Sequence, residues 1–303
     1  MRKLLIFTLF IFLSSSYWGQ QRMNSSLFSA QVPMMQPGWM GTREQTEILI
    51  GTRKQWLGWN GAPQTQYISI SSCLLNNKLG FGVNLSKDKT GARNTNEGSL
   101  VLNYITPINH KGWYWSSGIS VGYNRYSFNS SDLRVANNVD NNLNDYRSNP
   151  ILSFGFGTSL RMKNWKVGLY NNRLNNYLNS EVKPTRLNLI NQWSIFSSYN
   201  LEINSLLNVN SAIHLNALNA GKSNAELNAV LVYQDCMGIG LAYRYHESIG
   251  IPIQFKVAEQ IQVLYAYDFP IQQMLNSQSG THEIAVNVQI KSKPKAVLNP
   301  RFF

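Results

Sequence analysis

The sequence predicts an all-β fold, a transmembrane antiparallel β-barrel of about fourteen strands that follows a cleaved signal peptide. Three observations predict it. Large apolar side chains recur at every second position, the positions between them are small or uncharged, and short connections alternate with long ones along the chain. Period-two alternation is typical of strands, because successive side chains point to opposite faces. Short turns at one end and long loops at the other are typical of outer-membrane barrels.

The first residues predict a secretory signal peptide over residues 1–19. Arg2 and Lys3 form a basic start, an apolar run follows over 4–13, and Gly19-Gln20 offers a cleavage point. This apolar run is too short to cross a bilayer as a helix. We expect residues 20–43 to form a periplasmic N-terminal segment, and no obvious plug sequence precedes residue 44.

The barrel itself is expected over residues 44–291, with a C-terminal tail over 292–303. Alternation is clear in runs such as 113–123 and 237–246. Segments with this pattern lie near 44–54, 64–74, 78–88, 96–107, 112–127, 150–161, 165–174, 188–201, 205–216, 224–233, 237–246, 249–257, 260–268 and 281–291. Every second connection is short, whereas the long polar ones include 128–149, 174–187 and 269–280.

The composition favours this barrel over a secreted β-sandwich, which would also show alternating strands. Charged residues make up only 14% of the chain, whereas about 25% is usual in soluble domains. The second face of the strands carries Gly, Ser, Ala and Asn, where a water-facing surface would carry Lys, Glu and Thr. Closure also removes the unpaired edge that a bilayer does not tolerate. Two cysteines, Cys73 and Cys236, exclude a disulfide-rich scaffold and leave their pairing open.

The sequence carries no pattern that predicts an enzyme, a cofactor or a metal. The four histidines, at 110, 214, 246 and 282, are scattered and form no His-x-x-x-His pair. Residues 118–122 read Gly-Ile-Ser-Val-Gly, the string of a nucleophile elbow. Such an elbow needs a sharp turn from a strand into a helix, but Ser120 lies within a regular alternating run. We therefore interpret this string as a chance match.

Three motifs stand in order along the chain. The first is Arg53-Lys54-Gln55-Trp56 with Gly61-Ala62-Pro63, the second is Tyr265-Ala266-Tyr267-Asp268 with Gly280-Thr281-His282-Glu283, and the third is Asn299-Pro300-Arg301-Phe302-Phe303. Together they resemble the signature of the PorP/SprF family, the type IX secretion system membrane proteins of Bacteroidota. Gln36-Pro37-Gly38 departs from the family's common Asn-Pro-Ala.

The resemblance implies an outer-membrane barrel of the type IX secretion and gliding machinery. It implies that the partner is a secreted surface protein, such as an adhesin, bound through its C-terminal domain for export or retention. Periplasmic ring or peptidoglycan-binding components are further partners that it implies, with outer-membrane lipid around the barrel and no nucleic acid. We expect the three long loops to form the docking surface. The alternative is a diffusion channel or a transporter of hydrophobic solutes.

The signature residues also have plain physical readings. Trp56 would anchor at the membrane interface, and residues 61–63 would set a tight turn between the first two strands. His282 and Glu283 are adjacent on a strand, so their side chains point to opposite faces, and we expect the carboxylate to face the lumen. Asp268 precedes Phe269-Pro270 and is expected to start a turn.

Overall fold

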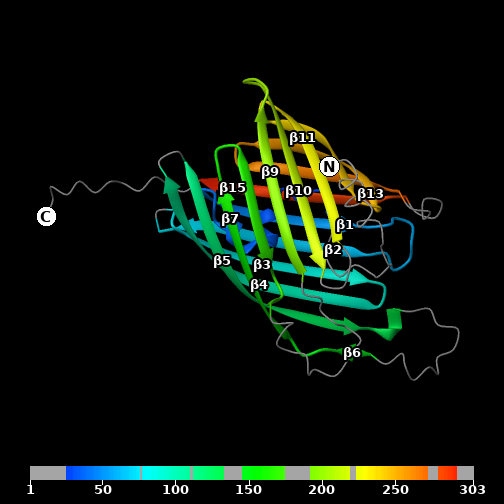
Figure 1. Cartoon of the computed structure of the whole chain (residues 1–303). Coiled ribbons are helices and arrows are strands. Elements are labelled where there is room, and N and C mark those ends of the chain that lie inside the picture. Colours follow the sequence, from blue (N-terminus) through cyan, green and yellow to red (C-terminus); the bar gives the residue numbers. More distant parts are fainter. Residues whose placement is uncertain are drawn as a thin grey trace, which may run out of the picture.

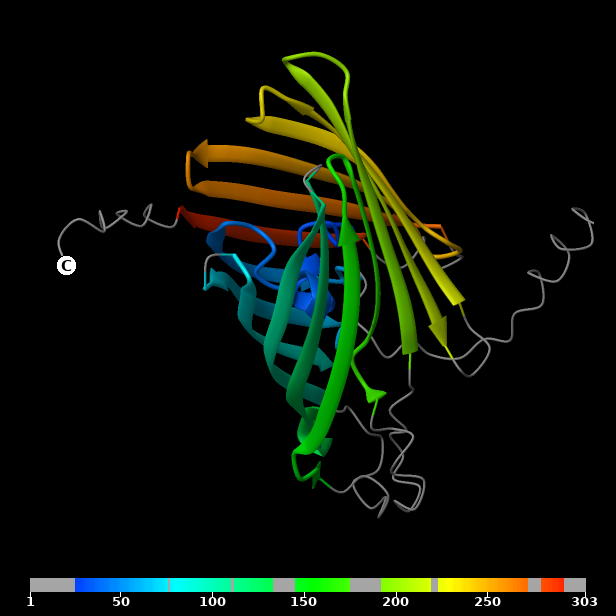
Figure 2. The ribbon, with the colours of Figure 1, turned by 60° about the vertical axis from the view of Figure 1, so that its left-hand side comes forward.

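The computed structural model describes residues 25–75, 77–109, 112–132, 145–174, 192–218, 223–271 and 279–291. Within them, fourteen strands form one closed antiparallel sheet in which each strand pairs with its neighbours in sequence (Figures 1 and 2). The barrel closes where the last strand pairs with the first, from Gln45↔Lys291 to Lys54↔His282. This confirms the predicted fold. Among the described residues, no helix is both long and apolar enough to cross a membrane.

All fourteen predicted segments correspond to observed strands of the wall. These are β1 (Gln45–Lys54), β2 (Gln64–Leu74), β3 (Leu79–Thr90), β4 (Arg93–Asn109), β5 (Trp113–Phe128), β7 (Ile151–Arg161), β8 (Trp165–Asn171), β9 (Gln192–Glu202), β10 (Leu207–Leu218), β11 (Ser223–Tyr233), β12 (Met237–Arg244), β13 (Ser248–Ala258), β14 (Ile261–Pro270) and β15 (Thr281–Lys291). A short additional strand, β6 (Tyr146–Arg147), pairs with the end of β5, and a 3-10 turn, η2 (Ser130–Asp132), follows β5.

The two ends of the barrel differ in their connections. One end, the short-turn rim, carries 75–78, 110–112, 162–164, 203–206, 234–236 and 259–260. The opposite end, the long-loop rim, carries all the long connections, namely 55–63, 129–150, 172–191 and 271–280. The same rim also carries three short connections, 91–92, 219–222 and 245–247, so the structure confirms that the long connections share one end but not that every second connection is long. Most of the three loops expected to form a docking surface, over 133–144, 175–191 and 272–278, lies outside the described residues.

The alternation in sequence becomes an outer and an inner face of the wall. Along β12, the side chains of Met237, Ile239, Leu241 and Tyr243 point outward and are 41–65% exposed. The intervening Ala242 is buried inside the barrel. An apolar surface of this extent would be unfavourable in water, so it matches the hydrocarbon that surrounds a membrane barrel.

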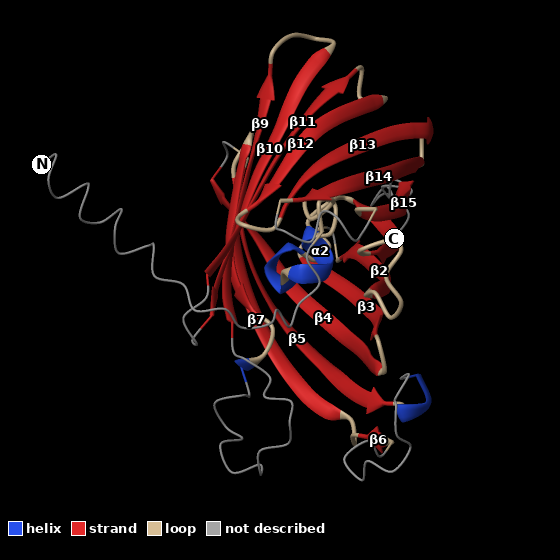
Figure 3. Ribbon diagram, turned by 90° about the vertical axis from the view of Figure 1, so that its right-hand side faces the viewer, coloured by secondary structure: helices blue, strands red, loops and turns tan. Residues whose placement is uncertain are grey.

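Residues 25–42, which we call the plug, lie inside the barrel (Figure 3). The plug contains a single helical turn, α2 (Val32–Met35), and a 3-10 turn, η1 (Pro37–Trp39). Its apolar side chains pack against the inner wall in two clusters: Leu27 with Leu49, Tyr67, Leu264, Ala266 and Ala285, and Phe28, Val32 and Trp39 with Phe196 and Ala212. The expectation of a periplasmic segment with no plug before residue 44 is therefore wrong for these residues.

Glycines of the plug and wall let the two backbones approach closely. A Cβ on Gly38 would lie 2.7 Å from the carbonyl oxygen of Gly157 in β7, and one on Gly80 would overlap the carbonyl oxygen of Met40. Gly41, at a φ of +67°, turns the chain from the plug towards β1. Part of the small-residue face seen in the sequence therefore accommodates the plug.

Candidate functional site

Three signature residues converge inside the barrel near the long-loop rim. Arg53 of β1 donates through Nη2 to Oδ2 of Asp268 at 2.7 Å and through Nη1 to Oε2 of Glu283 at 3.1 Å. All three side chains are at most 2% exposed. The register of the closing strands causes this convergence, because Arg53 is directly opposite Glu283 and β14 lies next along the sheet. A buried charge requires such partners.

The ion pairs continue around the inner wall. Arg244 at the end of β12 places Nη1 3.8 Å from Oδ2 of Asp268 and Nε 3.3 Å from Oε1 of Glu226 in β11. Nδ1 of His214 in β10 lies 3.7 Å from Oε2 of Glu226, and its Nε2 is hydrogen-bonded to the hydroxyl of Tyr170 in β8 at 2.7 Å. The result is a buried network in which arginines and carboxylates alternate from β1 to β10.

The beginning of the plug is hydrogen-bonded to this network. The hydroxyl of Ser25 lies 2.8 and 2.7 Å from the two carboxylate oxygens of Glu283, and Ser26 donates to Oδ1 of Asp268 at 2.5 Å. Gln31 donates through Nε2 to Oε1 of Glu283 at 2.7 Å. We call residues 25–31 the charged end of the plug, because the wall binds them through carboxylates.

The other end of the plug, residues 36–42, is held by uncharged groups near the short-turn rim. The carbonyl oxygen of Gly38 accepts hydrogen bonds from Asn103 Nδ2 at 3.2 Å, from Ser116 Oγ at 2.6 Å and from Ser159 Oγ at 2.8 Å. Asn103 also donates to the carbonyl oxygen of Met40 at 2.8 Å. We call this the neutral end of the plug. Two charged groups also contact this end: Arg161 donates to the carbonyl oxygen of Thr42 where the plug ends, and Nζ of Lys166 lies 5.5 Å from the centre of the Trp39 ring.

The loop that contains the first motif is joined to the second motif at the long-loop rim. The backbone amide of Leu57 donates to the carbonyl oxygen of Gly280 at 3.0 Å, and that of Ser279 donates to the carbonyl oxygen of Leu57 at 2.8 Å. The amide of Trp56 lies 3.4 Å from Thr281 Oγ1. Two motifs that are far apart in sequence therefore form one hydrogen-bonded surface.

Within that loop, the chain turns back on itself with strained or glycine-dependent geometry. The amide of Gln55 donates to the carbonyl oxygen of Pro63, and that of Ala62 donates to the carbonyl oxygen of Trp59. Gly61 has a φ of +78°, and Trp56 has a φ of +47°, which is uncommon for a side chain of its size. The rings of Trp56 and Trp59 meet edge to face at 5.9 Å. The loop thus presents a fixed pair of indoles.

The remaining signature residues that the structure describes lie on the outer face. The hydroxyl of Tyr265 is hydrogen-bonded to Nδ1 of His282 at 2.8 Å, and the ring of Tyr267 lies 4.8 Å from the ring of His282. His282 and Glu283 therefore point to opposite faces, with the carboxylate in the lumen, as the strand pattern predicts. Pro300 and Arg301 lie outside the described residues.

One expectation about a signature residue is wrong. Asp268 does not start a turn, because β14 continues to Pro270 and Asp268 pairs with Thr281 of β15. Its ion pair with Arg53 keeps the side chain directed into the lumen. The local preference of Asp before Phe-Pro is outweighed by this long-range interaction.

Half of the buried network and all of its contacts with the plug were not predicted from the sequence. Arg244, Glu226 and His214 occupy inward positions between apolar outward neighbours, where Gly, Ser, Ala and Asn are otherwise usual. A charged side chain on the small-residue face was the signal that could have identified them. Ser25 and Ser26 carried no comparable signal. Both cysteines are free: Cys73 is half-buried in β2, and Cys236 is exposed in the turn after β11.

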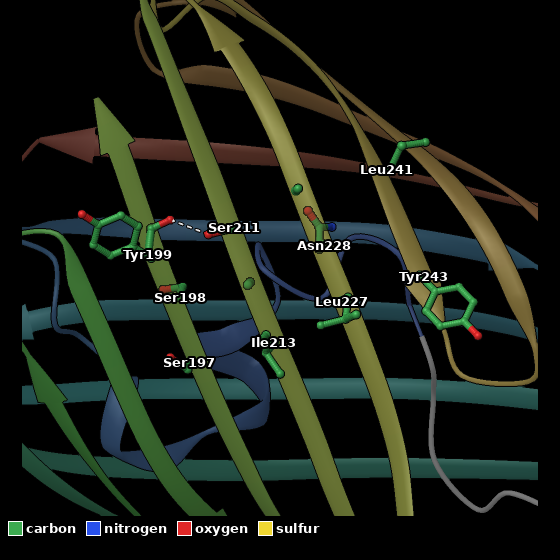
Figure 4. A pocket seen from close by; sticks show the side chains of 11 residues that line it. Ser197, Ser198, Tyr199, Ser211, Ile213, Leu227, Asn228, Leu241 and Tyr243 are labelled. Carbon is green, nitrogen blue, oxygen red and sulfur yellow. Dashed lines mark hydrogen bonds between the residues drawn. The ribbon is translucent and has the colours of Figure 1, made fainter. Parts of the chain in front are cut away.

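A hollow of about 410 Å³ lies on the outer face of β9 to β12 (Figure 4). Ser197, Ser211 and Ala229 occupy the outer face there, beside the larger Tyr199, Ile213 and Leu241. Its lining contains no charged residue. Because this face contacts lipid, the hollow suits a hydrocarbon chain of the bilayer and is not part of the lumen.

Comparisons with known proteins agree with the fold. A search of curated proteins returns no match. Among solved structures, a mutant of TodX, a monoaromatic hydrocarbon channel, is similar with a TM-score of 0.52 at 8% identity, over 86% of this chain and 94% of that one. A Pseudomonas aeruginosa FadL homologue matches with a TM-score of 0.46 at 9% identity, over 86% and 93% of the two chains. Acinetobacter baumannii Omp33 matches with a TM-score of 0.45 at 10% identity, over 84% and 100%.

The family comparison is more specific than these structural similarities, which at such identities concern the fold alone. Residues 18–288 match the family described as type IX secretion system membrane protein PorP/SprF. Together with the barrel fold, this match identifies an outer-membrane protein. The chain belongs to the PorP/SprF family of type IX secretion system membrane proteins.

Proposed function

We propose that this barrel binds the C-terminal domain of a secreted surface protein at its long-loop rim, and thereby retains that protein at the cell surface or assists its export. Membership of a type IX secretion family supports a role in secretion. Long loops of outer-membrane barrels face the exterior, so a secreted protein would meet this rim first. An adhesin as the partner and a contribution to gliding belong to the same proposal.

The observation that carries the proposal is the hydrogen-bonded loop 55–63. Its backbone is tied to residues 279–281, and it holds Trp56 and Trp59 in an edge-to-face pair, with Trp59 39% exposed. Tryptophan is enriched among the residues that dominate binding energy at protein interfaces. A loop that is already ordered loses little conformational entropy when a partner binds.

The plug favours a binding role over the alternative of an open diffusion channel. Residues 25–42 are hydrogen-bonded to the inner wall at both ends and pack apolar side chains against it in between. A lumen that contains an ordered segment is poorly suited to free passage of solute. Periplasmic ring or peptidoglycan-binding components would contact the opposite, short-turn rim.

The proposal is tested by replacing both tryptophans of the loop, Trp56→Ala and Trp59→Ala. The tagged protein is purified from native outer membrane in mild detergent, and bound proteins are quantified by mass spectrometry. We expect a large secreted protein to copurify with the wild type. Its affinity should fall by about thirtyfold or more in the variant, as for other hot-spot residues.

The matched control replaces two exposed tryptophans of the short-turn rim, Trp113→Ala and Trp165→Ala. It removes the same side chains from the opposite end of the barrel and should leave recovery of the partner unchanged. Heat-modifiable migration in gels verifies that both variants fold. Equal recovery from folded wild type and the loop variant would contradict the proposed docking surface.

A further inference from the structure

We propose that a band of basic side chains on the outer face binds phosphate groups of glycolipid headgroups in the outer leaflet of the outer membrane. The basic band lies at the long-loop ends of β1 to β6. Its members are Lys54, Lys87, Lys89, Arg125 and Arg147. The inference rests on the orientation of the barrel and not on the proposed partner protein.

The strand register places these residues on one face. Paired residues of neighbouring antiparallel strands point to the same side of a sheet. The pairings that connect the band are Lys54↔Gln64, Gln64↔Lys89, Lys87↔Asn96, Asn96↔Arg125 and Ser127↔Arg147. The band therefore runs across neighbouring strands, with uncharged polar residues between its members.

The basic band begins where the apolar outer surface ends. On β3, the outward side chains of residues 79, 81, 83 and 85 are Leu, Phe, Val and Leu, and the next two outward positions are Lys87 and Lys89. On β5, exposed Ile119, Val121 and Tyr123 precede Arg125. This position corresponds to the boundary between hydrocarbon and headgroups, because an aromatic girdle marks that boundary in outer-membrane barrels.

Few carboxylates balance this charge. Asp132 lies 3.0 Å from Lys89, whereas Asp88 is hydrogen-bonded to Thr65 at 2.6 Å on the inner side. Within the described part of β1 to β6, the outward positions of the band carry no acidic residue. Nε of Arg125 is buried without a hydrogen-bond partner.

On the other side of the barrel, the outward side chains at the long-loop rim are aromatic or apolar and not basic. At the long-loop ends of β12 to β14, the outward side chains are Tyr243, Tyr245, Ile249, Tyr267 and Phe269. These residues would interact with any lipid interface through their apolar surface. Among the described residues of these strands, the outward positive charge therefore lies on the β1 to β6 side of the rim and not on the β12 to β14 side.

Phosphate is the chemistry that fits this band. Guanidinium groups bind phosphate through paired hydrogen bonds, and lysines bind it as point charges. The side chains point sideways, immediately beyond the apolar belt, where lipid headgroups are the permanent neighbours of a barrel. The outer leaflet faces the long loops, and its glycolipids carry phosphate on their sugar headgroups. We therefore assign the band to these lipids rather than to an acidic protein.

The test compares binding of lipid A with binding of lipid A from which a phosphatase has removed the phosphates. The full-length protein is purified in mild detergent, and bound lipid is measured by native mass spectrometry. The test variant carries Lys54→Gln, Lys87→Gln, Arg125→Gln and Arg147→Gln. The control carries Lys78→Gln, Lys163→Gln, Lys256→Gln and Lys291→Gln, and so loses four exposed lysines of the short-turn rim.

We expect the wild type and the control to bind lipid A at least about tenfold more tightly than its dephosphorylated form, and the test variant to lose this preference. A variant with only two substitutions, Lys87→Gln and Arg125→Gln, should lose part of this preference. It replaces the variant with four substitutions if that one fails to fold. Retention of the preference in both folded variants would overturn the proposal. So would equal binding of the two lipids by the wild type, or displacement of lipid A by an equal concentration of inorganic phosphate. Loss of a copurifying acidic protein with unchanged lipid binding would assign the band to a protein instead.

Discussion

The two ends of the plug are held by different physical means. At the charged end, Ser25 and Gln31 bond to Glu283, whose charge Arg53 already balances. At the neutral end, backbone carbonyls accept from Asn103 and neighbouring serines, and glycines bring the two backbones into contact. Water could replace the first set of hydrogen bonds, whereas the second set depends on close contact between the two backbones.

The two ends of the plug differ in how easily each could leave the wall. The neutral end is continuous with β1 through Gly41 and depends on close fit. The charged end lies beneath the long-loop rim and depends on a network that remains paired without it. We therefore expect any displacement of the plug to start at the charged end.

Deletion of the whole plug, with both of its ends, should have the largest effect, because it opens the lumen to ions. Deletion of residues 25–42 takes away the apolar clusters and hydrogen bonds that fill the lumen. In planar lipid bilayers, we expect the wild type to be nearly silent and the deletion variant to conduct ions steadily. A folded but silent deletion variant would mean that wall side chains close the lumen without the plug.

Removal of the central cation of the charged end should destabilise the barrel strongly. Arg53→Met leaves Glu283 and Asp268 in the lumen without their closest positive partner, which typically costs about 3–5 kcal/mol. Urea unfolding in detergent, followed by tryptophan fluorescence, measures the loss. The control Arg173→Met breaks a partly exposed pair with Glu97 and should cost less than about 1 kcal/mol. Equal losses of unfolding free energy in the two variants would show that the buried ion pairs of Arg53 stabilise the barrel no more than the partly exposed pair of Arg173.

A hydrogen bond at the neutral end of the plug should contribute less to the free energy of unfolding than the buried ion pair of Arg53, but more than a hydrogen bond at the surface. Asn103→Ala removes two hydrogen bonds to the plug carbonyls and leaves these buried oxygens with fewer partners, at a cost of about 1–3 kcal/mol. The same unfolding measurement applies. Asn208→Ala, which breaks an exposed bond to Asp235, is the control and should change stability by no more than about 0.5 kcal/mol.

The smallest effect is expected for a plug side chain at the charged end. Ser25→Ala removes a hydroxyl that donates to Glu283 and accepts from Gln31 and from the amide of Leu27. Glu283 retains its contacts with Arg53, Tyr67 and Gln31. The loss should be about 1 kcal/mol in urea unfolding. A loss as large as that for Arg53→Met would contradict the view that water can replace this contact, and would make the charged end the firmer of the two.

The wall of the barrel is predictable from local sequence patterns. Strand positions follow from period-two alternation and from the composition of the turns, which are local properties of a few consecutive residues. The predicted segment 281–291 coincides with β15, and 64–74 coincides with β2. The opposite directions of His282 and Glu283 follow from the same local geometry. The motifs also identified Arg53, Asp268 and Glu283 as residues of interest.

The interactions of these residues depend on contacts between distant parts of the chain. Arg53 and Asp268 are 215 positions apart, and only closure of the barrel between β1 and β15 makes them an ion pair. The plug was invisible in the sequence because α2 is a single turn, with no periodic pattern to detect. Its position depends on shape and on hydrogen bonds to strands distant in sequence. Local patterns specify the elements of a fold, whereas contents of an enclosed lumen depend on contacts that exist only after the sheet closes.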